Sequence, residues 1–286
     1  MGKNPNRAAA AARAAEMRAE AARKEKQRKQ MITAVVAVVV VVIAVVVGVV
    51  IANRPQEAPP AASGTATTAL SKLTKLPAAT LDAAAAPAPG RAPKKLDGGA
   101  PLTADGKPKV LYVGAEFCPY CAMERWALIG ALGRFGTFEG LKATTSATNE
   151  AIPDIPTWSF VGSTYKSDYL AFEAVETQTR EFKPLQTLEG ENKSLFEKHN
   201  PGGGIPWVTF GGTHATDGAS VDAEVFRDAT YDSLIAGILD PKSPAGQTID
   251  PAINVLTAQL CTLTNNQPAD VCTSAGVTAA SAVLVK

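Results

Sequence analysis

Two cysteines separated by two residues, Cys118 and Cys121, are the residues in this chain best suited to chemistry. A thiolate is the nucleophile of disulfide exchange, and a second thiol one helical turn away can resolve the mixed disulfide that the first one forms. The apolar run 110–113 predicts a short buried strand before the pair, and the run that ends at Leu132 predicts an amphipathic helix after it. Cys118 would then lie at the N-terminus of that helix, where unpaired N–H groups and the helix dipole lower the pKa of a thiol.

The neighbours of the two cysteines should tune this chemistry. Pro119 has no N–H group and Tyr120 is bulky, so both should affect thiolate stability and substrate access. Glu116 should act in the opposite direction if its carboxylate lies close to the thiol, because a nearby carboxylate raises the pKa of a thiol. Two other interpretations of the cysteine pair stay open at this point: a disulfide that never turns over, or half of a metal site.

A metal site would need more ligands than the chain offers in a suitable pattern. Zinc requires two ligands besides the pair, and the candidates are Cys261, Cys272, His199 and His214. The two C-terminal cysteines lie far down the chain and lack the spacing of a zinc knuckle. We therefore predict no metal and no cofactor, and we interpret the two histidines as loop and helix-end residues.

The C-terminal cysteines, Cys261 and Cys272, flank a polar loop between two segments. A disulfide that closes a loop of about twelve residues stabilises a protein by roughly 3 kcal/mol. We therefore predict a Cys261–Cys272 disulfide with a structural role. A second redox pair that passes electrons to Cys118 and Cys121 is the alternative.

Residues 31–52 form an uncharged segment that consists mostly of valine. A helix of this length is about 33 Å long and matches a hydrocarbon core of roughly 30 Å. A basic cluster at 23–29 precedes the segment and only Arg54 follows it closely, so the positive-inside rule predicts a cytoplasmic N-terminus and an extracytoplasmic body. A cleaved signal peptide is the alternative, although its apolar region would exceed the usual 7–15 residues. In either case the cysteines lie in an oxidising compartment, where disulfides persist.

The composition divides the chain into segments. Residues 1–30 form a basic cytoplasmic head, 31–52 the transmembrane helix, and 53–106 a Pro/Ala-rich tether with a short docked segment at 70–82. Residues 107–286 form the extracytoplasmic α/β domain, with C-terminal helices over 222–286. The net charge of +1 gives no reason to expect nucleic acid as a partner. We interpret the head as a topology determinant that contacts anionic lipid headgroups.

The rest of the pattern predicts a mixture of strands and helices. Strands are expected at 141–148 and 169–177, a polar helix at 189–199, helices at 222–239 and from Asp250 onward, and an irregular insertion at 151–165. The stretch 83–106 is expected to be a loose loop. Val208 and Phe210 alternate as in a strand, and Gly211-Gly212 offers a hairpin turn after it.

The order of strand, CPYC, helix, strands, Ile-Pro strand and helix resembles the thioredoxin superfamily, and Pro119-Tyr120 is the dipeptide typical of glutaredoxins. From about Leu70 to the C-terminus, the chain is similar to a membrane-anchored family described as domain of unknown function 929, through the stretches LTADGKPKVLYVGAEFCPYCAMERWALIGALGRFGTFEGL, TWSFVGSTYKSDYLAFEAVET and GGGIPWVTFGG. The resemblance implies a thioredoxin-like central sheet flanked by helices. It also implies that the Ile205–Pro206 bond is cis and faces the dithiol. The family name implies no reaction, so the function must be argued from the site.

We therefore expect a membrane-anchored thiol–disulfide oxidoreductase that acts on exported proteins through Cys118, with Cys121 resolving the mixed disulfide. Pro206 and Ile205, with Pro119 and Tyr120, would bind a substrate chain as an added strand. The expected partners are the lipid bilayer, through 31–52, and exported cysteine-containing proteins or a membrane redox partner. The direction of the reaction depends on a reduction potential that the sequence does not show. The alternative is a non-catalytic scaffold subunit of a cell-envelope membrane complex, in which both cysteine pairs are structural disulfides.

Overall fold

A computed structural model describes residues 64–87 and 91–284 of the chain. The expected head (1–30), the expected transmembrane helix (31–52) and the first part of the tether lie outside the described residues. Within the described part, no helix is both long and apolar enough to cross a membrane. The described elements all belong to one compact unit.

A mixed sheet forms the centre of the fold. Its strands are β1 (Lys94–Lys95), β2 (Thr103–Ala104), β3 (Lys107–Gly114), β8 (Ala171–Glu176), β9 (Trp207–Phe210) and β10 (His214–Asp217). The path runs β1-β10-β9-β3-β2, and β8 also pairs with β3. Strand β3 is parallel to β8 and antiparallel to β9. The predicted hairpin turn at Gly211-Gly212 joins β9 to the antiparallel β10.

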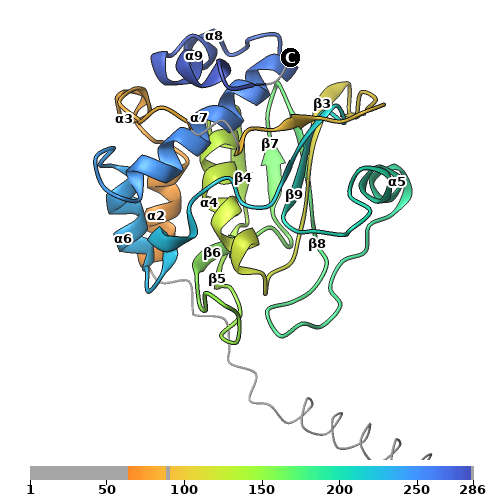
Figure 1. Cartoon of the computed structure of the whole chain (residues 1–286), viewed down its shortest axis with the longest axis horizontal. Coiled ribbons are helices and arrows are strands. Elements are labelled where there is room, and N and C mark those ends of the chain that lie inside the picture. Colours follow the sequence, from red (N-terminus) through yellow and green to blue (C-terminus); the bar gives the residue numbers. More distant parts are fainter. Residues whose placement is uncertain (1–63, 88–90, 285–286) are drawn as a thin grey trace, which may run out of the picture. The chain divides into compact units, whose positions relative to one another are not determined.

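Helices cover both faces of the sheet (Figure 1). One face carries α2 (Gly64–Leu73), α3 (Ala78–Asp82), α4 (Pro119–Leu132), α6 (Tyr231–Ile238), α7 (Gly246–Leu263), α8 (Ala269–Cys272) and α9 (Ala275–Ser281), and the other carries α5 (Gly190–His199). The apolar run of β3 lacks alternation because both of its faces are buried. Val110 and Tyr112 join the larger core on the α4 face, whereas Leu111 and Val113 pack in a smaller core beside α5.

The two longest helices of the described part, α4 and α7, are in close contact at a glycine. A Cβ atom at Gly130 would lie 2.7 Å from Cδ1 of Ile253, so a larger residue at this position would require the Ile253 side chain to move. This packing fixes α4 against the rest of the helical layer. It therefore also fixes the dithiol at the N-terminus of α4.

The stretch 151–165, predicted to be an irregular insertion, contains regular structure. Two small antiparallel sheets form there, β5 (Lys142–Thr145) with β6 (Pro156–Ser159) and β4 (Thr137–Glu139) with β7 (Thr164–Lys166). Trp158 of β6 is buried against Trp126 of α4, with ring centroids 4.6 Å apart. The Trp126 indole N–H donates to the carbonyl of Pro156 at 2.7 Å. Contacts with α4, whose Trp126 is 30 positions away in sequence from Pro156, therefore outweigh the local preference of Pro153 and Pro156 for a loop.

Three other predicted elements differ in their boundaries. The helix expected from Asp250 begins at Gly246, because Ser243 accepts the first free N–H groups of α7 through its hydroxyl and its carbonyl. The helix expected at 222–239 is divided into η2 (Ala223–Phe226) and α6, because Asp228 has a φ of 53° and Thr230 starts a new helix with a capping box. The stretch 83–106, expected to be a loop, contributes β1 and β2.

Candidate functional site

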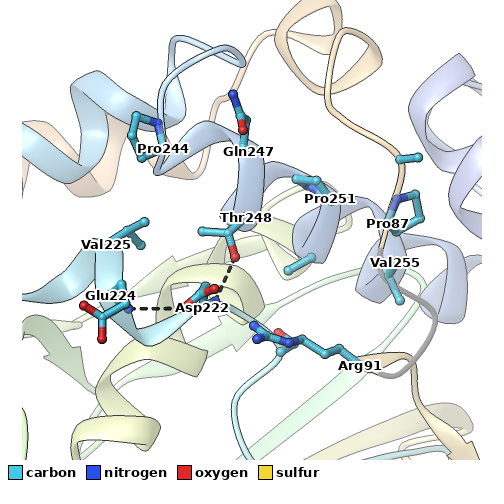
Figure 2. A pocket seen from close by; sticks show the side chains of 13 residues that line it. Pro87, Arg91, Asp222, Glu224, Val225, Pro244, Gln247, Thr248, Pro251 and Val255 are labelled. Carbon is cyan, nitrogen blue, oxygen red and sulfur yellow. Dashed lines mark hydrogen bonds between the residues drawn. The ribbon is translucent and has the colours of Figure 1, made fainter.

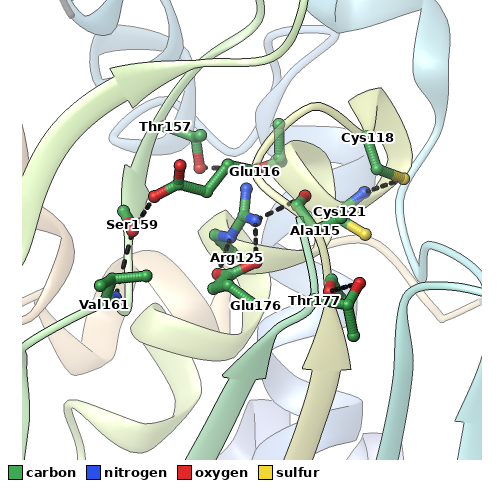
Figure 3. Close-up of polar contacts among 12 residues, drawn as sticks. Ala115, Glu116, Cys118, Cys121, Arg125, Thr157, Ser159, Val161, Glu176 and Thr177 are labelled. Carbon is green, nitrogen blue, oxygen red and sulfur yellow. Dashed lines mark hydrogen bonds and ion pairs between the residues drawn. The ribbon is translucent and has the colours of Figure 1, made fainter. Parts of the chain in front are cut away.

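The dithiol lies at the start of α4, four residues after the end of β3 (Figure 3). Cys118 is the N-cap of α4, and Pro119 occupies the first turn, where its missing N–H costs no hydrogen bond. The Cys118 sulfur accepts the N–H of Cys121 at 3.3 Å. Both cysteines are free thiols, Cys121 is fully buried and Cys118 is 5% exposed. Cys118 is therefore the only one of the two that solvent reaches.

The Ile205–Pro206 segment lies opposite Cys118. Its peptide bond is cis, as expected from the sequence. The Cys118 thiol lies 3.9 Å from the carbonyl oxygen of Ile205, which is a long contact of the kind that sulfur makes. The fold thus brings together four predicted residues, namely the two cysteines and the Ile-Pro pair, from segments more than 80 positions apart.

The two thiols have opposite pKa shifts. The hydrogen bond with the Cys121 thiol lowers the pKa of Cys118, and the backbone N–H groups of Cys121 and Tyr120 and the charge of Arg125 add to this effect against the cost of burial. Burial raises the pKa of Cys121, and the neighbouring Cys118 raises it further. Since the thiolate is the reactive form of cysteine, Cys118 is the better suited of the two to act as a nucleophile, whereas burial favours the protonated thiol of Cys121.

A buried ion pair, which the sequence pattern did not reveal, lies beneath the dithiol. Arg125 donates to both carboxylate oxygens of Glu176, at 2.7 and 3.0 Å, and both side chains are fully buried. The guanidinium also donates to the carbonyl of Ala115 and lies over the ring of Tyr112. Arg125 follows Cys121 by four residues, so the two share one face of α4. The signal in the sequence that could have identified this ion pair is a charged residue, Arg125, on the same face of an otherwise apolar helix as Cys121.

Glu116 does not oppose the Cys118 thiolate as expected. Its carboxylate accepts the hydroxyl of Ser159 at 2.5 Å and points toward β6, away from Cys118 (Figure 3). The causes of the Cys118 pKa shift include Arg125 but not Glu116. Instead, Glu116 adds to the effect of burial that raises the pKa of Glu176. The condition for an opposing effect, a carboxylate close to the thiol, is therefore not met, because adjacency in sequence does not fix the direction of a side chain.

Glu124, a buried acid on α4, holds a loop beside the dithiol. Oε2 of Glu124 accepts both the N–H and the hydroxyl of Ser220, each at 2.7 Å. Burial raises the pKa of Glu124 to about 7. Its Oε1 has no hydrogen-bond partner among residues 64–87 and 91–284. Glu124 therefore positions the loop 218–222 through one carboxylate oxygen.

This loop forms one wall of a groove next to Cys118. The groove has a volume of about 430 Å³. Its lining includes Tyr120, Ile205 and Arg91, and residues 218, 219 and 221–223 of this loop. A neighbouring hollow of about 440 Å³ shares Arg91 and Asp222 with it (Figure 2). In this second hollow, the Asp222 N–H donates to the hydroxyl of Thr248 on α7. Two of the predicted binding residues, Tyr120 and Ile205, thus line an open surface, whereas Pro119 is buried.

The second cysteine pair lies away from the dithiol. Cys261 and Cys272 form a disulfide that joins α7 to α8. Arg134, just beyond the C-terminus of α4, donates to Ser274 after α8. Because α4 has 14 residues and is therefore about 21 Å long, the disulfide is near the opposite end of α4 from Cys118.

The two histidines also lie outside the site. His199 ends α5 and His214 begins β10. Among the described residues, no group of three or more His, Cys, Asp and Glu side chains is arranged to hold a metal ion.

Comparison with known proteins gives one match. Residues 97–202 are similar to the family model described as Domain of unknown function (DUF929). The matched range includes the dithiol, Arg125 and Glu176, and it ends before Ile205. No curated protein and no solved structure matches the chain.

Proposed function

We propose that this protein is a thiol–disulfide oxidoreductase with a thioredoxin-like domain. The observation that carries the proposal is the division of roles between the thiols: Cys118 has a lowered pKa at a helix N-terminus, and Cys121 has a raised pKa behind it. The order of elements supports the fold, since α4 follows the central β3, β8 is parallel to β3, and the Ile-Pro segment precedes the antiparallel β9.

The reaction follows from these roles. The Cys118 thiolate attacks one sulfur of a substrate disulfide, that S–S bond breaks, and the departing substrate sulfur takes a proton. Cys121 then loses its proton and attacks the Cys118 sulfur of the mixed disulfide, which releases the second substrate thiolate. The products are a substrate dithiol and a Cys118–Cys121 disulfide. The reverse sequence oxidises a substrate dithiol, and the reduction potential decides the direction.

The proposed location is the outer face of a membrane, with residues 31–52 as the anchor and the N-terminus in the cytoplasm. The uncharged segment and the basic cluster before it support this topology. The substrates would then be exported proteins with cysteines, or a membrane protein that renews the dithiol.

A second candidate function is a non-catalytic scaffold in a cell-envelope complex. The low exposure of Cys118 favours it, because a nucleophile that turns over must be reached by another sulfur. The polarised pKa values favour the enzyme, because a purely structural pair has no need of a thiolate.

Trapping of the mixed disulfide distinguishes the two functions. In the full chain, Cys121→Ser removes the resolving thiol, so substrates should accumulate on Cys118 as adducts that a reductant releases. The matched control Cys118→Ser with Cys121→Ser should give no adducts. If the single variant traps nothing in its own cells and the wild-type protein fails to reduce insulin or to reshuffle scrambled ribonuclease, the oxidoreductase proposal is wrong.

A further inference from the structure

The loop after β8 exposes an aromatic ring in an unusual backbone conformation. Phe182 is 39% exposed and has a φ of 61°. This left-handed region is unfavourable for a bulky residue. Positions of this kind persist only where the surrounding structure determines them, and they are concentrated at functional sites.

Hydrogen bonds hold this loop in place. The Thr179 N–H donates to the carbonyl of Lys183 at 2.8 Å, and the Thr179 hydroxyl accepts the N–H groups of Glu181 and Lys183. The Arg180 side chain crosses to the β5–β6 segment, where it donates to the carbonyl of Ser146 and to Asp154. The exposed position of Phe182 therefore belongs to a braced loop.

The Phe182 ring forms a stacked pair with a ring on the segment that leads into α4. It stacks on Phe117, with ring centroids 4.5 Å apart and an interplanar angle of 28°. Phe117 directly precedes Cys118 in the chain. On the groove side of the dithiol, the ring of Tyr120 is 47% exposed. Exposed rings therefore lie on Tyr120, two positions after Cys118, and on Phe182, which stacks on the residue before Cys118.

The loop 218–222, which forms one wall of the groove, has main-chain N–H groups that a bound chain could use. The N–H groups of Gly218, Ser220 and Asp222 are bonded to the body of the protein. By contrast, no hydrogen bond within the described part engages the N–H groups of Ala219 and Val221, and both residues line the groove. Such alternate free donors suit an extended chain that adds as a strand.

These features identify the occupant. Because Cys118 is only 5% exposed, a substrate sulfur must arrive on a thin segment rather than on a folded surface. An extended polypeptide in the groove would meet the main chain of 219–221 and the exposed ring of Tyr120, and Phe182 offers it a further exposed apolar ring. The charges around Phe182 favour neither an acidic nor a basic substrate segment. Asp154 pairs with Arg180, and the exposed Glu181 and Lys183 have opposite signs.

We propose that Phe182 is a specificity-determining residue that binds a large apolar side chain next to the cysteine of an unfolded substrate segment. The inference rests on the proposed oxidoreductase function. It adds a substrate class: exported chains before they fold, or after they have lost their fold, whose apolar side chains are still free.

Two short peptides test the proposal with the full-length protein in detergent. Each is a Gly/Ser-rich chain with one central cysteine held as a mixed disulfide with thionitrobenzoate, and one of them has Phe beside the cysteine where the other has Ser. Attack by reduced Cys118 releases the coloured thiolate and leaves the peptide on Cys118, and Cys121 then frees the peptide thiol. We expect the wild-type protein to react about tenfold faster with the Phe peptide, as for one partly buried aromatic side chain.

Variants of the ring separate this role from general damage. Phe182→Ser should bring the ratio of the two rates close to one, and Phe182→Tyr should keep it near the wild-type value. Leu239→Ser, which removes another exposed apolar side chain of the described part, should leave both rates unchanged. A wild-type ratio near one, or a ratio that Phe182→Ser does not alter, overturns the specificity role alone. Failure of the wild-type protein to react with either peptide overturns the oxidoreductase proposal instead.

Discussion

The buried Arg125–Glu176 ion pair costs the protein free energy of desolvation. Taking both ions out of water is unfavourable, and well-packed apolar residues often replace such pairs without loss of stability. The position of Arg125 suggests why the pair is kept. The cation lies on the same helix face as Cys121 and lowers the pKa of Cys118, after the larger effects of the hydrogen bonds at that sulfur.

Substitution of this pair tests the electrostatic role. Arg125→Met alone should destabilise the protein by about 3–5 kcal/mol, because Glu176 is then buried without a partner. Arg125→Met with Glu176→Gln should recover most of that stability. The double variant should still have a higher Cys118 pKa than the wild type, seen as slower alkylation at neutral pH. An unchanged pH profile of alkylation would contradict the electrostatic role, and Arg134→Met, a change at the other end of α4, serves as the control.

Asp250 is a residue whose charge opposes folding. Neither of its carboxylate oxygens has a hydrogen-bond partner within the described part of the chain, and burial raises its pKa to about 8. An acid with a raised pKa in the folded state favours folding while it is protonated. Its contribution is therefore complete below the unfolded pKa near 3.8 and falls as the pH rises toward 8. Asp250→Leu should raise the free energy of unfolding at pH 8 by about 1–3 kcal/mol, measured by urea denaturation. A loss of stability at that pH would show that the carboxylate has a partner in solution.

Some residues of the site were predictable and others were not, for a physical reason. The dithiol and the Ile-Pro pair are short local patterns, because their chemistry needs fixed spacing at a helix N-terminus and before a strand. The partners of Arg125 and Glu124 lie 51 and 96 positions away. Such pairs depend on which face of which element meets another, and one sequence does not contain that information.

At the level of elements, the helix α4 contributes to the site in two ways. Its N-terminus lowers the pKa of Cys118, and its buried Glu124 fixes the loop that forms the groove. Strand β3 was predicted because its apolar run is continuous. The strand β6 was not, because it becomes a strand only through contacts of its tryptophan with α4.

Glu124 should make stability depend on pH. Burial raises its pKa from the ordinary 4.5 to about 7 in the folded protein. Stability from this group is present below pH 4.5 and declines by up to about 3 kcal/mol as the pH rises to 7. Glu124→Gln should remove this decline, measured as unfolding free energy from pH 4 to 8 in an Asp250→Leu background.

A matched variant tests the direction of this effect. Ser220→Ala removes a hydroxyl donor that lowers the Glu124 pKa. The decline in stability should therefore continue to a higher pH than in the wild type. If the decline instead ends at a lower pH, Ser220 does not stabilise the ionised form.

The disulfide between α7 and α8 is predicted to act on stability alone. Cys261 and Cys272 are 11 positions apart, so their bond closes a short loop. Their joint replacement by alanine should lower the free energy of unfolding by roughly 3 kcal/mol. The rate at which Cys118 is alkylated should not change, because the disulfide is near the other end of α4. A slower or faster Cys118 in the double variant would support the electron-relay alternative.

At the level of the whole molecule, the described unit holds the dithiol beside a central sheet that helices cover on both faces. The cellular location of the protein is inferred from the segment that precedes this unit, residues 31–52. Residues 31–52 have no charge, and in a bilayer a single segment of this kind satisfies its backbone only as a helix. The proposed substrates, unfolded exported chains, are available to the dithiol only if this segment carries the domain across the membrane.

Two charges within the segment should therefore change the location of the entire chain. Each lysine at the centre of a spanning helix costs about 2.5–3.5 kcal/mol by insertion scales. The wild-type chain should stay with the membrane fraction in high salt, and protease added outside sealed right-side-out vesicles should digest the domain. Val40→Lys with Val45→Lys should move the chain to the soluble fraction and keep the domain on the cytoplasmic side, where reductants would hold Cys261 and Cys272 as thiols. Val40→Leu with Val45→Leu is the matched control and should behave as the wild type. A wild-type chain that salt releases from the membrane, or a domain that outside protease does not reach, would contradict the proposed topology.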